Sequence, residues 1–357
     1  MSVAVSVASA ADDAGVRRLL RSQVMPGRVR LSFCREPDFS IGCAVTGDDY
    51  RVLVARAQPD DEVVGVACRS VRRVFLNGRE QRLGYLGQLR VDDRYRGRWL
   101  VSRGFAILEQ MHRDDPLPAY LASIVDANDE ATGILVRKAR PGFPQFREVA
   151  RYVTLALRVK RWPSTGRAGA RAITTKTSPP VLEEVADFLR REGARRQLCS
   201  VWTADALRRL ETLGLRPDDM LVARKDGAIV GVMALWDQSA YKQSVIRGYS
   251  GWLRAAAPLL PRLGTKLRSA YASLVSIAND DAGTFGSLLH QVYSLAAQRG
   301  FDYLLIGFDV RDPLFEFARR QSHIAYPSRL YLASWPTGGH RHEPLDARPA
   351  YVDIATL

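Results

Sequence analysis

Three arginines lie where an apolar run of residues gives way to a helix-like pattern. Arg94, Arg96 and Arg98 stand between the strand-like run 83–91 and a predicted helix that starts near Leu100. A helix N-terminus carries unpaired backbone N–H groups and a partial positive charge, so it attracts anions. Basic side chains beside it add charge-assisted hydrogen bonds. The segment therefore predicts either a phosphate site or a solvated turn, and the surrounding elements must decide between the two.

The whole chain carries an excess of positive charge. Its formal net charge is +14, and only six of its 52 basic residues are lysine. A cationic field favours phosphate-bearing partners, which include nucleic acid and phosphate-rich cofactors. The sequence argues against nucleic acid, because it has no zinc-finger spacing, no aromatic-rich RNA platform and no concentrated basic tail. A phosphate-bearing cofactor is the better expectation.

Cysteine and histidine are sparse and give no metal-binding pattern. The four cysteines show no paired spacing, which argues against a disulfide framework and a cysteine zinc site and fits a reducing cytoplasm. His340 and His342 stand in a Pro/Gly-bounded loop without other obvious ligands, so no metal is expected. No apolar run approaches the roughly 20 residues that cross a bilayer, and Asp12 and Asp13 interrupt the start too early for a signal peptide. We expect a cytoplasmic protein with no membrane contact, and the sequence does not fix its oligomeric state.

A pair of short β-branched runs around a polar turn occurs twice. The runs 52–56 and 63–67 match the later runs 220–224 and 229–234, which flank an Asp226-Gly227 hairpin signal. The copies lie roughly half a chain apart, so they predict two domains of one fold. Such Val-Gly-Val hairpins also recur by chance, so the elements downstream of each copy must strengthen the case.

The same order of elements comes after both hairpins: a strand, a helix, a strand and a second helix. In the first copy these elements are predicted at 83–91, 100–112, 120–125 and 129–138. In the second copy they are predicted at 270–277, 283–299, 303–308 and near 313–320. The boundary is expected in 162–180, where Pro, Ser, Thr, Gly and basic residues replace the apolar pattern; this gives domains 1–165 and 172–357. A last strand is expected at 351–355, opposite 330–335.

This order resembles the GNAT acyltransferase superfamily, in a tandem arrangement over nearly the whole chain. The GNAT signature is a strand that ends in Val, a short loop, and Gln/Arg-x-x-Gly-x-Gly/Ala at the start of a helix. Here the strand end resembles Leu89-Arg90-Val91, and the loop resembles Arg96-Gly97-Arg98-Trp99-Leu100-Val101. In the family, backbone amides of this loop hold the pyrophosphate of acetyl-coenzyme A. A second element of the family resembles Asn128, the helix after it and Gly142-Phe143.

The resemblance implies a mixed α/β (α+β) fold of two tandem GNAT-like domains, with acetyl-CoA or another acyl-CoA as co-substrate and no metal. The competing interpretation is an unrelated mixed α/β protein with a phosphate-binding loop. The cofactor-binding residues that the resemblance implies are Leu89, Arg90, Val91, Arg94, Arg96, Gly97, Arg98, Trp99, Leu100, Val101 and Asn128.

The sequence departs from the family pattern in three places. Trp99 and Val101 occupy the signature's small positions, where their side chains could obstruct the cofactor. The tyrosine that many relatives use as a general acid would fall near Leu135, which has no hydroxyl. The corresponding loop of the second half presents Asp280 and Asp281, which should repel a pyrophosphate and are typical of a helix N-terminus. We therefore expect the first half to bind acyl-CoA and the second half to be structural or to shape the substrate cleft.

Acyl transfer to an amine requires a group or a water chain that removes a proton. Polar residues on the central strands are the candidates: Tyr85 and Gln88 on one, Ser123 and Asp126 on the next. Tyr85 and Asp126 are the predicted catalytic residues, although Tyr85 also fits a packed strand tyrosine and Asp126 a helix cap.

The leading functional hypothesis is an acyl-CoA-dependent N-acyltransferase, and more narrowly an N-acetyltransferase, that acts on a small-molecule or peptide amine. The alternative is a non-catalytic protein that binds CoA or another ligand and keeps the fold. The second half carries a longer excursion at 236–266. Its middle, the apolar run 252–260, either packs as a helix on its own domain or packs across the domain boundary and walls the acceptor side of the first-half cleft. In the second case Asp280, Asp281 and Asp309 are candidates for selecting cationic amines.

Overall fold

The computed structural model describes residues 2–25, 29–97, 99–136, 142–159, 181–251, 254, 262–335 and 343–357. Outside this set lie Arg98, the expected boundary segment 162–180, all of the apolar run 252–260 except Arg254, and the pair His340 and His342. The expectations about those residues stay predictions.

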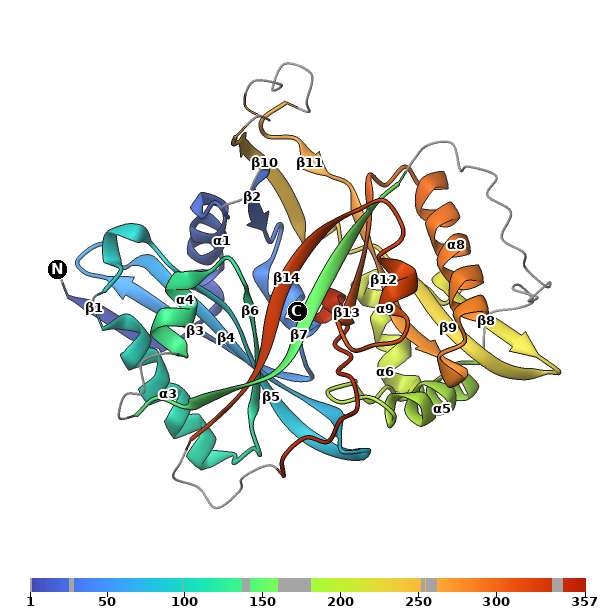
Figure 1. Ribbon diagram of the computed structural model, residues 1–357. Coiled ribbons are helices and arrows are strands. Elements are labelled where there is room, and N and C mark those ends of the chain that lie inside the picture. Colours follow the sequence, from blue (N-terminus) through green and yellow to red (C-terminus); the bar gives the residue numbers. More distant parts are fainter. Residues whose placement is uncertain are drawn as a thin grey trace.

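The first half begins with a strand and a helix and then builds an antiparallel meander (Figure 1). Its strand–helix–strand–helix–strand run comes next, as predicted from the sequence. The elements are β1 Val3–Val7, α1 Asp13–Ser22, β2 Val29–Cys34, α2 Phe39–Ala44, β3 Asp49–Ala57, β4 Glu62–Leu76, β5 Arg79–Val91, α3 Leu100–Asp114, β6 Tyr120–Val125, α4 Asp129–Leu135 and β7 Gln145–Arg158.

The second half repeats this order from its hairpin onward. Strand β12, helix α8, strand β13, helix α9 and strand β14 correspond to β5, α3, β6, α4 and β7. The elements are α5 Leu182–Gly193, α6 Ala204–Arg209, β8 Met220–Lys225, β9 Ala228–Trp236, β10 Gln243–Tyr249, β11 Lys266–Leu267, β12 Ser269–Ile277, α8 Ala282–Gln298, β13 Tyr303–Asp309, α9 Phe315–Ala318 and β14 His323–Ser334.

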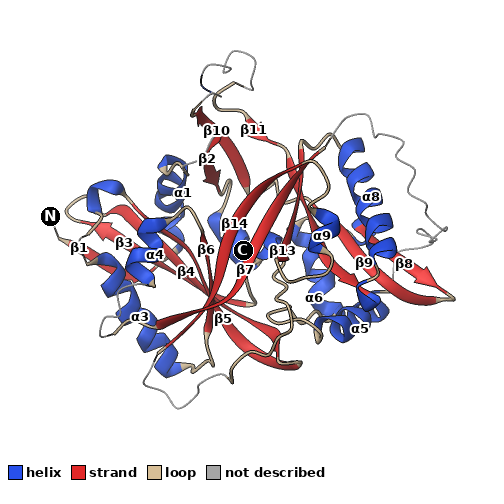
Figure 2. Ribbon diagram, in the orientation of Figure 1, coloured by secondary structure: helices blue, strands red, loops and turns tan. Residues whose placement is uncertain are grey.

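The two halves share one 11-stranded sheet, which helices flank (Figure 2). Its strand order is β1-β3-β4-β5-β6-β14-β7-β13-β12-β9-β8. The last strand of each half is therefore exchanged: β14 pairs with β6 of the first half, and β7 pairs with β13 of the second. The exchanged strands pair with each other along almost their whole length and run side by side through the middle of the molecule (Figure 1). The fold is thus a mixed α/β tandem whose halves are joined through backbone hydrogen bonds.

A second, three-stranded sheet also joins the halves. Strand β10, from the excursion of the second half, pairs antiparallel with β2, which lies between α1 and α2 of the first half. The buried Gln243 side chain fixes this contact, because it accepts from the Glu36 amide at 3.1 Å and donates to the Glu36 carbonyl at 2.8 Å. Strand β10 thus packs across the boundary, whereas the prediction for the apolar run 252–260 stays untested.

The long helices begin and end where their sequences require. Helix α8 starts at Asp281, whose carboxylate accepts the Thr284 amide at 2.7 Å, and it stops before Gly300, which has φ +72°. Its buried face packs Phe285, Leu288 and Val292 onto the sheet. Each such side chain contributes about 1.5–3 kcal/mol of transfer free energy.

The expected strand at 351–355 is not formed. The segment is extended up to Asp353 and then turns through a 3₁₀ helix at Ile354–Thr356, while β14 pairs instead with β6 and β7. Core groups satisfy its backbone: the Tyr152 hydroxyl donates to the Val352 carbonyl and accepts from the Val352 amide. The prediction was wrong because the alternating apolar residues of this segment face a core, not a neighbouring strand.

Candidate functional site

A wedge opens between β5 and β6 in the first half. The two strands pair in parallel only at Gly84–Tyr120 and Tyr85–Leu121, although both continue beyond these pairs. The wedge also coincides with a bulge, because Gln88 has φ +58° and the register of β5 against β4 shifts there. A bulge interrupts the hydrogen-bond ladder and re-aims the strand.

An apolar cavity of about 100 Å³ lies at this wedge. That volume exceeds the space one water molecule needs, and an apolar lining gives water few partners. The cavity therefore suits an alkyl chain better than solvent. Its lining comes from the bulged part of β5, from α3 and α4, and from β1, β3, β4, β6 and β7. It includes Leu86, Gly87, Leu89, Arg90, Val91, Leu100, Val101, Gly104, Phe105, Leu108, Ala122, Leu135 and Phe146.

Five of the predicted cofactor residues, Leu89, Arg90, Val91, Leu100 and Val101, line this cavity together. Sequence reasoning missed Gly104, Ala122 and Phe146, which complete it. Gly104 carried the only available signal, since a glycine in the middle of a predicted helix often has a packing or functional reason.

The N-terminus of α3 is open to an anion. Its N-cap is Trp99, which makes no side-chain cap hydrogen bond, and its first turn carries no acidic residue. The other described helices of ten residues or more differ: α8 has a carboxylate cap, and α1 and α5 have acids in their first turns. Gly97, with φ +75° and nothing within 4 Å of its potential Cβ, gives a ligand close access to the main chain.

The arginines of the loop already have acidic partners. Arg94 pairs with Asp92 at 2.8 Å and Glu62 at 3.0 Å, and the hydrogen bonds that it donates to these two carboxylates raise its pKa. Arg96 pairs with Asp93 at 2.8 Å and with Glu130 at 2.7 Å. All these pairs are exposed or partly exposed, so a phosphate could displace a carboxylate at modest cost. Arg98 lies outside the described residues.

Trp99 does not belong to the core. Its side chain is 72% exposed, and its backbone is left-handed with φ +60°. A single exposed aromatic side chain is ordinary on a protein surface, so exposure alone assigns Trp99 no role.

The remaining predicted site residues lie outside the cavity lining. Asn128 caps α4 through its side-chain oxygen, which accepts the Ala131 amide at 3.0 Å. Asp126 accepts from Arg329 of β14 at 3.1 Å. Tyr85 is buried, and desolvation raises its pKa to about 12. Its ring nevertheless lies directly against Gly87, which does line the cavity.

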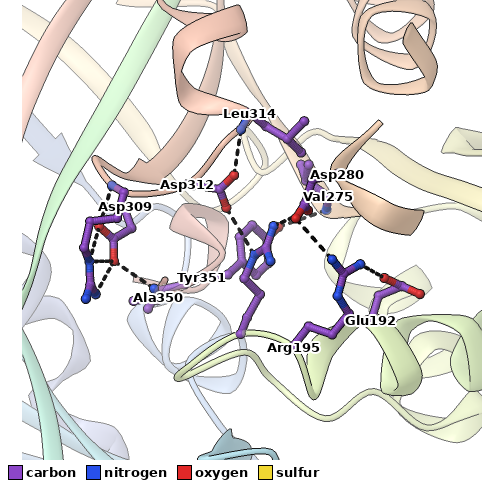
Figure 3. Close-up of polar contacts among 12 residues, drawn as sticks. Glu192, Arg195, Val275, Asp280, Asp309, Asp312, Leu314, Ala350 and Tyr351 are labelled. Carbon is purple, nitrogen blue, oxygen red and sulfur yellow. Dashed lines mark hydrogen bonds and ion pairs between the residues drawn. The ribbon is translucent and has the colours of Figure 1, made fainter. Parts of the chain in front are cut away.

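The equivalent wedge in the second half is filled by the chain itself. Strands β12 and β13 pair from Ser269 to Tyr271 and then separate, and Leu274 with φ +54° repeats the bulge of Gln88. Asp353 accepts the Leu274 amide at 2.9 Å. The Tyr351 hydroxyl accepts the Val275 amide at 2.9 Å (Figure 3). In the second half, the backbone amides at the bulge are therefore hydrogen-bonded to Asp353 and Tyr351, whereas the bulge of the first half lies beside a cavity.

The three acids predicted to select cationic amines have structural partners, and Figure 3 shows contacts of two of them, Asp280 and Asp309. Asp280 pairs with Arg195 and Arg196, and Asp281 caps α8. Asp309 is fully buried, pairs with Arg311, and accepts the Ala350 amide at 2.8 Å. They act as structural acids that hold the second half together.

Among the described residues, no group of three or more His, Cys, Asp or Glu side chains is arranged to hold a metal ion. Within the same residues, no helix is both long and apolar enough to cross a bilayer.

The shared wedge, bulge and element order can be compared with solved structures. N-myristoyltransferase from Saccharomyces cerevisiae, solved with bound myristoyl-CoA, superposes with a TM-score of 0.66 at 11% identity over 98% of this chain and 84% of that one. A GCN5-related N-acetyltransferase from Sphaerobacter thermophilus gives a TM-score of 0.57 at 15% identity over 99% of this chain and 98% of that one. The fold is that of the GNAT superfamily.

A third GNAT structure is part of a larger protein. It is the GCN5-related glucosamine N-acetyltransferase region of a fungal multi-domain β-N-acetylglucosaminidase, with a TM-score of 0.62 at 15% identity; the match covers 93% of this chain but 38% of that one. No model of a protein family matches the sequence, and no curated protein matches it. The tandem GNAT fold is therefore established by structure, at identities too low to transfer an activity.

Proposed function

We propose that this protein is an acyl-CoA-dependent N-acyltransferase, with acetyl-CoA as its donor and an amine as its acceptor. One observation carries the proposal: the apolar cavity in the β5–β6 wedge lies beside a helix N-terminus that has no cap. An acyl-CoA needs this combination, because its pyrophosphate is anionic and its pantetheine and acyl parts form a narrow chain. The solved neighbours include a protein with bound myristoyl-CoA, which supports an acyl-CoA donor on this fold.

The donor would lie with its pyrophosphate at the backbone amides around Trp99 and Leu100. Gly97 permits close approach, and Arg96 would exchange Glu130 for a phosphate oxygen. The thioester would then reach the bulge at Gln88. A backbone N–H released from the ladder there is placed to donate to the thioester oxygen as charge develops on it.

In the reaction the amine nitrogen forms a bond to the thioester carbon, the C–S bond breaks, and CoA leaves as a thiolate that takes up a proton. Tyr85 suits the role of proton donor to the thiolate. Its pKa of about 12 keeps the phenol protonated at neutral pH, and its ring borders Gly87 of the cavity. Asp126 stays a candidate base, and it would have to release Arg329 to act.

Isothermal titration of the full chain with acetyl-CoA, CoA and myristoyl-CoA tests the donor side, and release of free thiol with a panel of amines tests turnover. Micromolar binding of acetyl-CoA with thiol release supports the proposal. Preference for myristoyl-CoA would correct the donor but keep the reaction. Binding without release for any amine would favour a non-catalytic CoA-binding protein, and absence of binding of all three ligands at millimolar concentration would exclude both.

The arginine loop supplies a variant for this test. Arg96→Ala combined with Arg98→Ala should weaken acyl-CoA binding by about 1.5–3 kcal/mol for each charged hydrogen bond lost. Arg190→Ala combined with Arg191→Ala, which removes two exposed charges from α5, is the matched control. Equal affinities in the two double variants would show that the loop arginines are surface charges.

A further inference from the structure

Three basic side chains are brought together at the junction of the halves. Arg35 follows β2, Arg90 lies on β5, and Lys242 precedes β10. Arg35 is only 7% exposed. Cys34 pairs with Gln243 between β2 and β10, so the adjoining residues Arg35 and Lys242 lie next to each other. Desolvation and then repulsion from Arg35 lower the pKa of both Arg90 and Lys242, which agrees with the three charges lying near one another. We refer to Arg35, Arg90 and Lys242 as the junction cations.

Tyrosines from both halves surround the junction cations. Burial lowers the pKa of Arg35, and the groups that offset this are Tyr271, Cys43, Tyr85 and Tyr241. Tyr85 and Tyr271 occupy equivalent positions in the repeat, each three residues before its bulge. Lys242 Nζ lies 4.8 Å from the centroid of the Tyr271 ring. Phenol rings and hydroxyls stabilise a cation only weakly compared with a carboxylate.

The described residues do not supply negative charge to balance this group. None of the junction cations forms an ion pair with a described Asp or Glu, and Arg35 makes one hydrogen bond, to the Cys34 carbonyl at 3.3 Å. Lys242 donates to backbone oxygens of Ala355 and Leu357. A carboxylate at residue 357 would balance Lys242 alone and leave both arginines without an acidic partner.

The next acidic group within electrostatic range of Lys242 is Asp353, whose carboxylate is already hydrogen-bonded to other groups. Asp353 accepts from the Leu274 and Ala355 amides and from the Ser273 hydroxyl, all within 3.1 Å. Arginine does not release its proton in proteins, so Arg35 and Arg90 cannot relieve their charge as a lysine can. Arg35 is thus a buried charge without an acidic partner, which is costly, and a ligand anion is a common reason for keeping such a charge.

Unsatisfied polar atoms lie next to the same group. Gln238 is buried, its Nε2 donates to the Ala355 carbonyl that Lys242 also contacts, and its Oε1 has no partner among the described residues. Arg72 Nε is likewise buried without a partner among those residues, and Arg72 stacks on the Tyr85 ring. The Arg72 Nε donor suits an anionic group of a ligand, whereas the Gln238 Oε1 acceptor suits an N–H or O–H of the same ligand.

The junction cations adjoin the cofactor cavity. Arg90 belongs to the cluster and also lines the cavity, and Gly87 of the lining lies under the Tyr85 ring. An anion bound at Arg35 and Arg90 would therefore be held within a few side-chain lengths of the thioester. The second half contributes Tyr241, Lys242 and Tyr271 to this place, so it would take part in acceptor recognition.

We propose that Arg35, Arg90 and Lys242 form the acceptor subsite and bind an anionic group, a carboxylate or a phosphate, carried by the amine that is acylated. This rests on the proposed acyltransferase function. It reverses the expectation that the second half selects cationic amines.

The test uses the full chain with acetyl-CoA and acceptors matched except for the anionic group. Suitable sets are ω-amino acids of two to five carbons, their amides and the corresponding aminoalkylphosphonates. We expect kcat/KM for one anionic series to exceed that for the amides by roughly 10- to 100-fold, the range of a charge-assisted hydrogen bond. The stronger series identifies carboxylate or phosphate as the natural group.

Arg35→Gln should remove that preference by raising KM for the anionic acceptors, while KM for acetyl-CoA and turnover of the amides stay unchanged. Arg90→Gln should also remove the preference, and it should change KM for acetyl-CoA as well, because Arg90 lines the donor cavity. Arg191→Gln on exposed α5 is the matched control. Arg35→Lys, which keeps the charge, should restore part of the preference if Arg35→Gln folds poorly. A preference that survives both Gln variants, or equal use of neutral and anionic amines by the wild type, would overturn the inference and leave the acyltransferase function intact.

Anion binding can also be measured without turnover. Glutarate or inorganic phosphate at millimolar concentration should raise the Tm of the wild type more than that of Arg90→Gln. If no amine in the panel is acylated, an equal rise in Tm for the wild type and Arg90→Gln overturns the proposed subsite. The acetyl-CoA titration decides the proposed function separately.

Discussion

At the scale of single residues, Trp99 is the clearest departure from the GNAT pattern, and its placement supports a role in ligand binding. The side chain is too exposed to be core, and we propose that it covers the cofactor at the N-terminus of α3. We expect Trp99→Gly to leave stability unchanged or slightly raised, because glycine adopts a positive φ without strain. Acyl-CoA affinity should fall roughly tenfold as the aromatic contact is lost.

The control for Trp99→Gly is Asp226→Gly, in the β8–β9 turn. Asp226 has φ +51°, so its replacement by glycine removes the same kind of backbone strain at a position away from the site. Titration calorimetry and thermal unfolding of both variants separate the two effects. Tighter acyl-CoA binding in Trp99→Gly would identify the native side chain as an obstruction.

A second residue-scale prediction concerns Asp12, which connects the start of α1 to β3. Its carboxylate accepts from Arg56 Nη2 at 2.6 Å and from the Ser9 amide at 2.7 Å, and the Arg56 hydrogen bond lowers its pKa. A lowered pKa in the folded state gives stability that is present above the unfolded value of about 3.9 and is lost as pH falls below it. Asp12→Asn should cost about 1.5–3 kcal/mol at pH 7.

The pH profile distinguishes this interpretation from a simple packing defect. Denaturant unfolding of Asp12→Asn and wild type should differ most at pH 7 and converge as pH falls towards 3. A constant difference across that range would show that the charge of Asp12 is not what stabilises the fold.

The sequence predicted which segments border the cavity, namely the end of β5 and the start of α3. It did not predict which distant residues contact the side chains of these segments. The run 89–101 predicted where the cavity lies, because the spacing of a strand, a loop and a helix is local. The engagement of Arg96 by Glu130, or the burial of Arg35 among tyrosines of the other half, depends on residues far away in the chain. No local pattern contains that information.

At the scale of elements, the opening of α3 towards β5 and β6 decides whether a ligand can enter. Gly104 lies on α3, lines the cavity, and has nothing within 4 Å of its potential Cβ. Gly104→Leu should therefore be accommodated and should even favour the helix by about 0.8–1 kcal/mol. Acyl-CoA binding should be lost, because the side chain fills the cavity.

Gly133→Leu on α4 is the matched control, since that glycine also has nothing within 4 Å of its potential Cβ and does not line the cavity. Calorimetric titration and Tm together give the result. Full acyl-CoA affinity in Gly104→Leu, with Tm retained, would place the acyl-CoA site outside this cavity.

Element order was predictable because helix and strand periodicities are local. Strand β6 was predicted at its observed bounds, and α3 and α8 within two residues at each end. The exception was 351–355, whose alternating apolar residues matched a strand. The segment instead fills the β12–β13 wedge, a place that exists only once the second half is assembled.

At the scale of the whole molecule, the exchange of β7 and β14 makes each half depend on the other. The sequence predicted two domains at 1–165 and 172–357, and it contained no sign that their last strands change places. We expect residues 1–165 expressed alone to lack a cooperative unfolding transition, because β14 is missing from between β6 and β7. The same chain co-expressed with residues 172–357 should give a folded complex that unfolds cooperatively.

Circular dichroism melts of the two preparations are the measurement. A cooperative melt and retained acyl-CoA binding by residues 1–165 alone would contradict the expected dependence. They would also show that the second half serves only acceptor recognition.

The exchanged strand also sets an order of events during synthesis. The ribosome makes 164 residues, numbers 159–322, between the end of β7 and the start of β14. At roughly 5–20 residues per second this takes on the order of 10–30 s, during which β6 and β7 lack the strand that joins them. Strand edges without partners pair readily with other chains. The nascent first half is therefore the stage at which this protein is most exposed to aggregation, and slower translation of the second half would lower its yield without changing the finished fold.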